Sequence, residues 1–99
     1  MDTMESFDKF GPTPREIEEQ VTTLLNQMQA IRGIAHIRSH HVENRVAVQA
    51  EIAVDDKLSV REARQIAQLA RYKIEQIKGV DSADLHLELD IDHVRSDDN

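Results

Sequence analysis

The sequence predicts an α+β fold with the element order α-β-β-α-β. Two stretches carry apolar residues at helical spacing, each directly after a helix-capping signal. Three other stretches alternate apolar and polar residues with a period of two, as half-exposed strands do. A chain of 99 residues is long enough for one domain with a modest core. We therefore expect one domain over residues 13–93, a flexible arm over residues 1–12 and a flexible tail over residues 94–99.

The composition narrows the kinds of site and partner. There is no cysteine, so disulfides and thiolate sites are excluded, and any metal site must use His, Asp or Glu. A net charge of −7 disfavours nucleic acid, because an acidic chain repels phosphate backbones. No apolar run approaches the ~20 residues that cross a bilayer, and the acidic start of the chain is no signal peptide. The sequence predicts a cytoplasmic protein without membrane insertion.

The first helix is predicted to begin after Thr13 and to end at Gly33. Thr13 and Glu16 match a capping box, and Pro14 suits the first helical position. One apolar face follows at Ile17, Val21, Leu24, Met28 and Ile31. Gly33 then fits a C-terminal cap.

Two strands, over residues 34–42 and 45–55, are predicted to form an antiparallel hairpin. Glu43 and Asn44 make the turn, and Asn44 is expected to take the positive φ. In the second strand, apolar residues alternate with a mixed set, which indicates a sheet covered on one face.

The position of the turn sets which residues face one another across the hairpin. A loop centred on it places His36 opposite Glu51 and Arg38 opposite Gln49. In the first strand, one face is expected to carry Ala35, Ile37 and Ser39, and the other His36, Arg38 and His40.

One more helix and one more strand complete the predicted fold. Ser59 and Glu62 form a second capping box, apolar residues continue to Ile77, and Gly79 ends the helix. The last strand, over residues 83–91, points Ala83, Leu85, Leu87, Leu89 and Ile91 one way, and Asp84, His86, Glu88, Asp90 and Asp92 the other.

The second strand, second helix and third strand should form a right-handed crossover between parallel strands. In the common split arrangement another strand lies between the two parallel ones. We therefore expect a three-stranded mixed sheet in the order 2-1-3. Helices would cover its apolar face, and the histidines would lie on the open face.

Four side chains are predicted to meet on that open face: His36, Glu51, His86 and Glu88. Opposed side chains in a sheet have Cβ atoms about 4.5–5.5 Å apart, which is close enough to share an ion. Imidazole and carboxylate ligands fit Zn²⁺, and they also suit nickel, cobalt, copper or ferrous iron. The alternative is an ordinary solvated face, with His–Glu pairs that only hydrogen-bond.

Weaker candidates for metal binding lie elsewhere. His40 is roughly 13 Å from His36 along the strand, so it cannot join the same ion. His40 or His41 would instead seed a second site near the hairpin tip or at a dimer junction. His93 with Asp90 or Asp92 is a third candidate. The alternative for all of them is solvation without metal.

Nothing in the sequence indicates an enzyme. The hydroxyl residues Thr13, Ser39, Ser59 and Ser82 lack a base and an orienting partner, and two of them are helix caps. Three glycines do not form a phosphate-binding loop.

Three segments resemble the cytoplasmic C-terminal domain of the cation diffusion facilitator (CDF) transporters: AIRGIAHIRSH, VAVQAEIAVDDKLSVREARQIAQLARYKIEQIKGV and ADLHLELD. The resemblance covers about residues 13–91. It implies a metallochaperone-like (ferredoxin-like) fold, a V-shaped homodimer, and metal binding near the dimer interface that changes how far the dimer opens.

The resemblance also implies ligand positions. His36 matches the histidine of the family's first strand, and Glu51 falls where some members carry a histidine in the second strand. His86 and Glu88 match the histidine and the acidic residue of the family's terminal strand. Arg64 stands where some members carry a further histidine, so a binuclear site using that position is not expected.

Two functions therefore stand as hypotheses. The first is a standalone homodimeric domain that binds zinc or a similar ion and senses, buffers or delivers it, or regulates a membrane cation transporter. The alternative is a metal-independent interaction or dimerisation module, in which residues 1–12 or the open face dock a partner.

Overall fold

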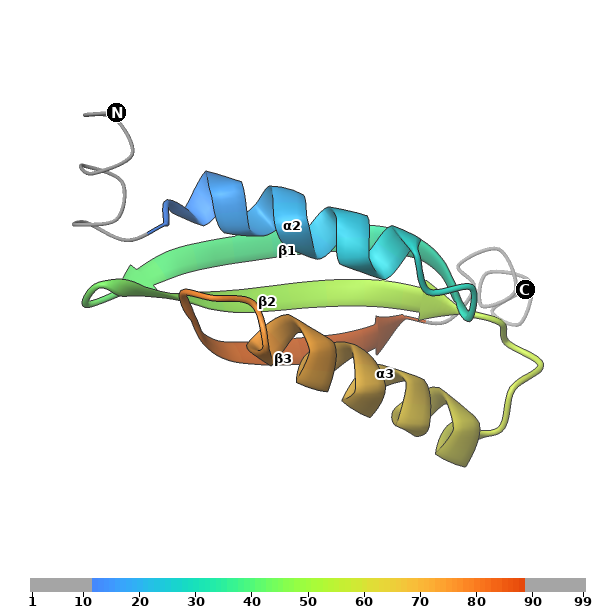
Figure 1. Cartoon of the computed structure of the whole chain (residues 1–99). Helices are drawn as coiled ribbons and strands as arrows, with labels where there is room; N and C mark the ends of the chain where they lie inside the picture. The colour runs from blue at the N-terminus through green and yellow to red at the C-terminus, as the bar shows by residue number, and fades with distance from the viewer. Residues whose placement is uncertain (1–11, 89–99) are drawn as a thin grey trace, which may run out of the picture.

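The computed structural model describes residues 12–88, and it confirms the predicted element order. Figure 1 shows helix α2 (Pro14–Asn26), strands β1 (Ile31–Val42) and β2 (Arg45–Val54), helix α3 (Val60–Glu75) and strand β3 (Val80–Glu88). Both helices lie on the same face of the sheet, as the sequence predicts. Residues 12–88 contain no helix that is long and apolar enough to span a membrane.

Helix α2 begins as predicted and ends earlier than predicted. The Glu16 amide donates to the Thr13 hydroxyl, and the Glu16 side chain accepts from the Thr13 amide, so the capping box is present. Gln27 caps the C-terminus, and its N–H donates to carbonyls of the last turn. The expected end at Gly33 is wrong, because Ile31 and Gly33 pair with β2 as strand residues. Sheet pairing therefore overrides the helical spacing of Met28 and Ile31.

The hairpin register is confirmed. His36 pairs with Glu51 and Arg38 with Gln49, as the turn position predicts. The positive φ is wrong by one residue, since it belongs to Glu43 (φ 59°) and not to Asn44.

A β-bulge in β1 changes the orientation of one residue. The register shifts between Ile34 and His36, which leaves Ala35 as an extra residue without a partner. Ala35 consequently lies on the open face beside His36, and the expectation that it shares the face of Ile37 is wrong. The bulge lets Ile34 and Ile37 both pack against the core.

The strand order is β1-β2-β3, so the expected order 2-1-3 is wrong. Strand β2 is central: it pairs antiparallel with β1 and parallel with β3. Its core-facing residues explain this placement, because all of them are 0–3% exposed: Val46, Val48, Ala50, Ile52 and Val54. At the edge of the sheet, part of this apolar row would stay exposed to water. Each large side chain left fully exposed would cost about 1.5–3 kcal/mol of folding free energy.

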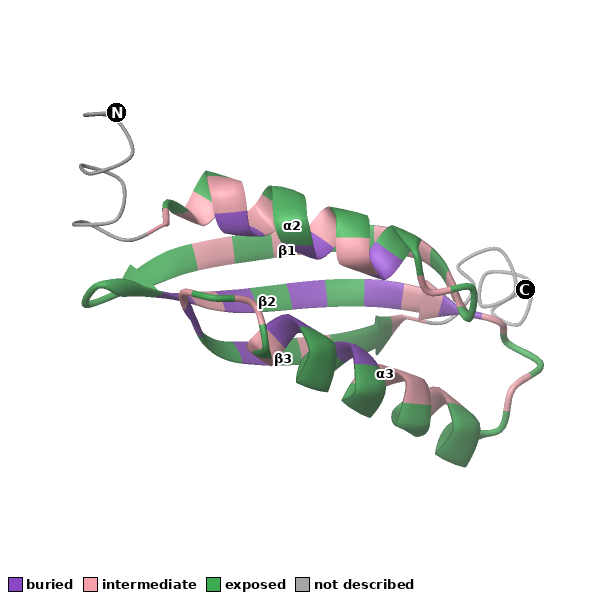
Figure 2. Cartoon of the chain, viewed as in Figure 1, coloured by how far each residue is buried: buried purple, intermediate pink, exposed green. Residues whose placement is uncertain are grey.

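The core lies between the two helices and the central strand. Ile17, Val21 and Leu25 come from α2, and Ala70 and Ile74 come from α3. In Figure 2 the buried parts of both helices lie on the sides that face the sheet. No helix of residues 12–88 covers the other face of the sheet, and most of the polar side chains there are exposed.

Helix α3 ends at Glu75 with Gln76 as its C-cap, so the expected end at Gly79 is wrong. Gly79 instead lies in the turn that connects α3 to β3. Gly79 has φ +97°, a conformation that side chains rarely adopt. A Cβ there would lie 2.2 Å from Cγ of Pro12, so the start of the described chain packs directly on this turn. The strand that follows begins at Val80, three residues before the expected start.

Candidate metal centre on the open face

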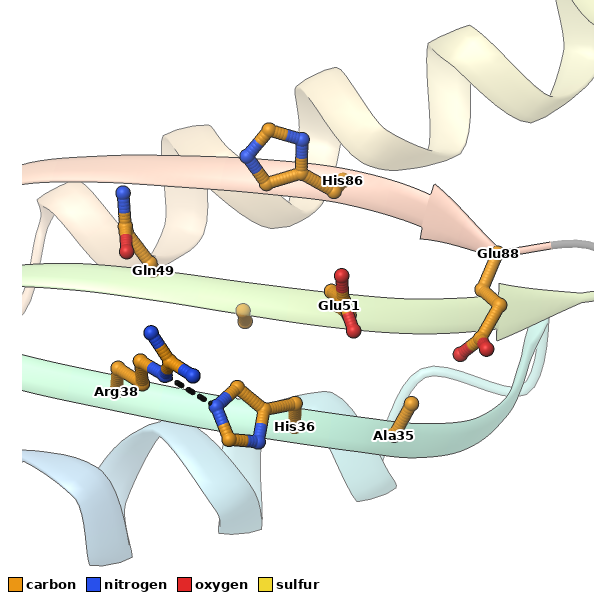
Figure 3. Close-up of a pocket in the computed structure, with 8 residues that line it drawn as sticks. Ala35, His36, Arg38, Gln49, Glu51, His86 and Glu88 are labelled. Carbon is orange, nitrogen blue, oxygen red and sulfur yellow. Dashed lines mark hydrogen bonds between the residues drawn. The ribbon is translucent and has the colours of Figure 1, made fainter.

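The uncovered face of the sheet carries two parallel rows of polar side chains. The first row crosses the three strands as His36, Glu51 and His86. The second row, one step along the strands, is Arg38, Gln49 and Asp84. The sheet order therefore places Glu51 between two histidines, as Figure 3 shows.

A shallow depression of about 560 Å³ lies over these rows. All four predicted metal ligands line it, together with Ala35, Arg38, Gln49 and Ala50. Glu88 lies at the far end of β3, where it pairs with Ala53 of the central strand. The structure thus brings together on one surface the residues that the sequence placed there.

The two histidines are farther apart than expected. The order 2-1-3 would make β1 and β3 neighbours, whereas both now flank β2. Two strand spacings separate their Cα atoms by about 10 Å. For one ion to contact both rings, each imidazole would have to lean toward Glu51 and form a metal–nitrogen bond of about 2.0–2.1 Å.

Each histidine is hydrogen-bonded to its neighbour two residues away. Nε of Arg38 donates to Nε2 of His36 at 2.5 Å. Nε2 of His86 lies 3.1 Å from Oδ2 of Asp84, and both of these side chains are largely exposed. Sequence reasoning missed these partners, although residues i and i+2 of a strand share a face and the spacing was visible.

As positioned, the side chains do not form a closed coordination sphere. Within residues 12–88, no three His, Asp or Glu side chains are grouped closely enough to hold an ion. The donor set nonetheless fits a divalent transition metal, because imidazole and carboxylate are its ordinary ligands in proteins.

The weaker candidates have different surroundings. His40 pairs with Ala47, which lies beside Ser82, so among residues 12–88 its row contains no second ligand. His41 pairs with Val46 and is exposed. Asp90, Asp92 and His93 lie outside the described residues. A metal site at any of these positions stays a prediction.

Two charged residues are placed by the fold away from the open face. Arg64 is exposed on α3, which covers the opposite face of the sheet. Asp55 follows β2, where a hydrogen bond from the backbone N–H of Lys57 lowers the pKa of its carboxyl group. Asp55 also lies 3.7 Å from Arg32, so this carboxylate stabilises the loop before α3.

Comparison with known proteins identifies the family. Residues 13–90 match the family described as "Cation efflux protein, cytoplasmic domain". The chain belongs to this family. Membership implies a homodimer attached to a membrane cation transporter, on the cytoplasmic side. The family is a regulatory domain of transporters rather than a class of enzyme.

Solved structures of the same fold include variants of the MamM C-terminal domain. A copper form and a cadmium form each share 19% sequence identity with this chain, and a nickel form shares 17%. All three align with a TM-score of 0.70 over 75% of this chain, and over 94%, 94% and 95% of their own length, respectively. A search of curated proteins gives no match.

Proposed function

We propose that this domain binds a divalent transition-metal ion on its open sheet face and uses that ion to adjust its homodimer. The observation that carries the proposal is the cross-strand row His36–Glu51–His86, with Glu88 at its edge. Zinc is the ion that we favour, because two imidazoles and one or two carboxylates are its common ligand set.

The electrostatics of the face support a cation. The depression and the row beside it carry Glu51, Glu88 and Asp84 against the single positive charge of Arg38. With neutral histidines the surface is therefore net negative. The absence of cysteine leaves only harder nitrogen and oxygen donors, which suit Zn²⁺, Ni²⁺, Co²⁺ and Cu²⁺ better than Cu⁺.

A regulatory role follows from the geometry of an open site. An ion on an exposed face stays open to solvent and to a second protomer, so either can add a ligand to its shell. Binding that is tighter in one dimer arrangement shifts the population toward that arrangement. We infer that the domain senses or buffers cytoplasmic metal in this way, regulates a cation efflux transporter, and performs no catalytic step.

Calorimetric titration with Zn²⁺ tests the proposal. The variants His36→Ala and His86→Ala should each weaken zinc binding by more than ~10-fold, because each loses a ligand. His40→Ala is the matched control, since it removes an exposed histidine from the same strand whose row holds no other ligand. Equal affinities in all four proteins would refute the site.

A metal-independent dimerisation module is the second candidate. It is favoured by the lack of a closed group of three ligands among residues 12–88. In that case Zn²⁺ would leave the sedimentation of the protein unchanged, and the double variant H36A/H86A would dimerise like the original chain.

A further inference from the structure

We propose that Arg38 acts as an internal competitor for the metal: it occupies the ligating nitrogen of His36 in the metal-free protein and so sets the affinity of the open face. This inference rests on the proposed function and concerns its regulation. The bond that carries it is the 2.5 Å contact between Nε of Arg38 and Nε2 of His36, drawn as a dashed line in Figure 3.

The chemistry of the two groups determines the direction of this bond. A guanidinium has five N–H donors and no acceptor, so Nε2 of His36 must be the acceptor. The lone pair of Nε2 is therefore directed at Arg38. A neutral imidazole has one protonated nitrogen, and in His36 that nitrogen must be Nδ1. Neither nitrogen of His36 then offers a free lone pair to an ion.

His86 is in the opposite state. Its Nε2 faces the carboxylate of Asp84, which only accepts when it is ionised, so Nε2 carries the proton. In the neutral ring the Nδ1 lone pair is then free. A carboxylate behind a histidine is a common arrangement around metal ligands, because it fixes the tautomer and raises the basicity of the ring. The same row thus holds one histidine ready to ligate and one that is withheld.

The sheet holds Arg38 in this competing position. Arg38 and His36 are two residues apart on one face of β1, so their side chains stand side by side. The residue opposite Arg38 on β2 is Gln49, which has no charge to draw the guanidinium away. Glu51, the nearest carboxylate on β2, lies opposite His36 instead.

Metal binding must consequently displace Arg38. The ion has to replace a charge-assisted hydrogen bond at Nε2 and approach a fixed positive charge. Both costs lower the affinity: when the guanidinium swings toward solvent the charge repulsion is relieved, but the hydrogen bond to His36 is lost. Arg38 therefore raises the metal concentration at which the face becomes occupied, which keeps binding reversible.

The test compares Arg38→Leu with the matched control Arg64→Leu. Both changes remove one exposed arginine, but Arg64 lies on α3, which packs on the other face of the sheet. R38L should bind Zn²⁺ about tenfold more tightly than the original chain, which corresponds to roughly one charge-assisted hydrogen bond. R64L should bind like the original chain.

Two further measurements show whether Arg38 acts through His36. Adding R38L to the H36A variant should raise its zinc affinity by much less than R38L does in the original chain, since the competed nitrogen is gone and only the repulsion by the guanidinium charge is removed. In metal-free protein, ¹⁵N NMR of the imidazoles should place the proton of His36 on Nδ1, and R38L should reduce that population.

The outcomes separate this inference from the proposed function. Equal zinc affinity in R38L and the original chain, or a His36 proton on Nε2, would overturn the role of Arg38 alone. No zinc binding in either protein, with the His36 proton on Nδ1, would overturn the proposed function and with it the role of Arg38 in affinity.

Discussion

At the scale of single residues, the open face is asymmetric. His36 and His86 lie in one cross-strand row, yet their partners differ in charge: a guanidinium for one and a carboxylate for the other. The two partners belong to the neighbouring row and face each other across Gln49. We therefore expect Arg38 to weaken metal binding by His36 and Asp84 to strengthen metal binding by His86.

Asp84 should strengthen metal binding where Arg38 weakens it. Replacing Asp84 by Ala removes the acceptor that fixes His86, and zinc affinity is expected to fall about tenfold, at the lower end of losses seen for such partners. Asp81→Ala is the matched control, since it removes an exposed carboxylate from the same strand. Isothermal titration of the three proteins with Zn²⁺ checks this prediction. An equal loss of zinc affinity in both variants would instead show that the effect comes from removing any negative charge.

At the scale of the elements, the caps and the turns determine where each helix and strand begins. Both capping boxes form as their sequences predict, at Thr13 and at Ser59. The two glycines of the described chain play different parts. Gly79 makes the turn before β3 with positive φ, whereas Gly33 lies in β1 with open space beside its Cα.

Alanine at each glycine should therefore have opposite effects on stability. Gly79→Ala is expected to lower the free energy of unfolding by more than ~1 kcal/mol, because the new Cβ needs a strained φ and would collide with Pro12. Gly33→Ala should be neutral or raise it by up to about 1 kcal/mol, since it restricts only the unfolded chain. Urea denaturation of both variants measures the difference. A G79A protein as stable as G33A would contradict the turn geometry.

At the scale of the whole molecule, one layer of helices covers one face of the sheet. Strand β2 is buried by both helices on one side and carries Gln49 and Glu51 on the other. This division leaves the metal candidates on an exposed surface of the protomer.

Zinc should stabilise the folded dimer through that surface. At a zinc concentration of 100 Kd, binding to the folded state alone adds about 2.7 kcal/mol to the free energy of unfolding. For a domain of this size that corresponds to a rise in Tm of roughly 10–20 °C. Differential scanning calorimetry with and without zinc gives the shift, and analytical ultracentrifugation gives the dimer fraction. The double variant H36A/H86A should show neither effect; if it showed the same rise, the ion would bind elsewhere.

Much of the candidate site could be read from the amino-acid order. The two-residue turn at Glu43-Asn44 determines the hairpin register, because a slip of one residue would turn the apolar face of β2 outward. His36 therefore had to oppose Glu51. The alternation in the last strand likewise placed His86 and Glu88 on the same face. These inferences need only local geometry and a period of two.

Most of the features that the sequence misled on depend on contacts between distant segments. Met28 and Ile31 continue the helical spacing of α2, but pairing with β2 takes Ile31 and Gly33 into a strand. The bulge at Ala35 lets Ile34 and Ile37 both reach the core, and no residue type announces it. The hydrogen bonds of the histidines depend on side-chain rotation.

The sequence by itself determined the five elements, the N-terminal caps of the helices, the hairpin register and the polar face that carries the histidines, because each follows from neighbours in the chain. Only the tertiary structure decided the strand order. That choice depends on which strand gains most from being covered on both edges and by both helices, and the fully apolar row of β2 gains more than the mixed row of β1. With β2 in the centre, Glu51 lies between His36 and His86, and the geometry of the candidate metal centre follows from that placement.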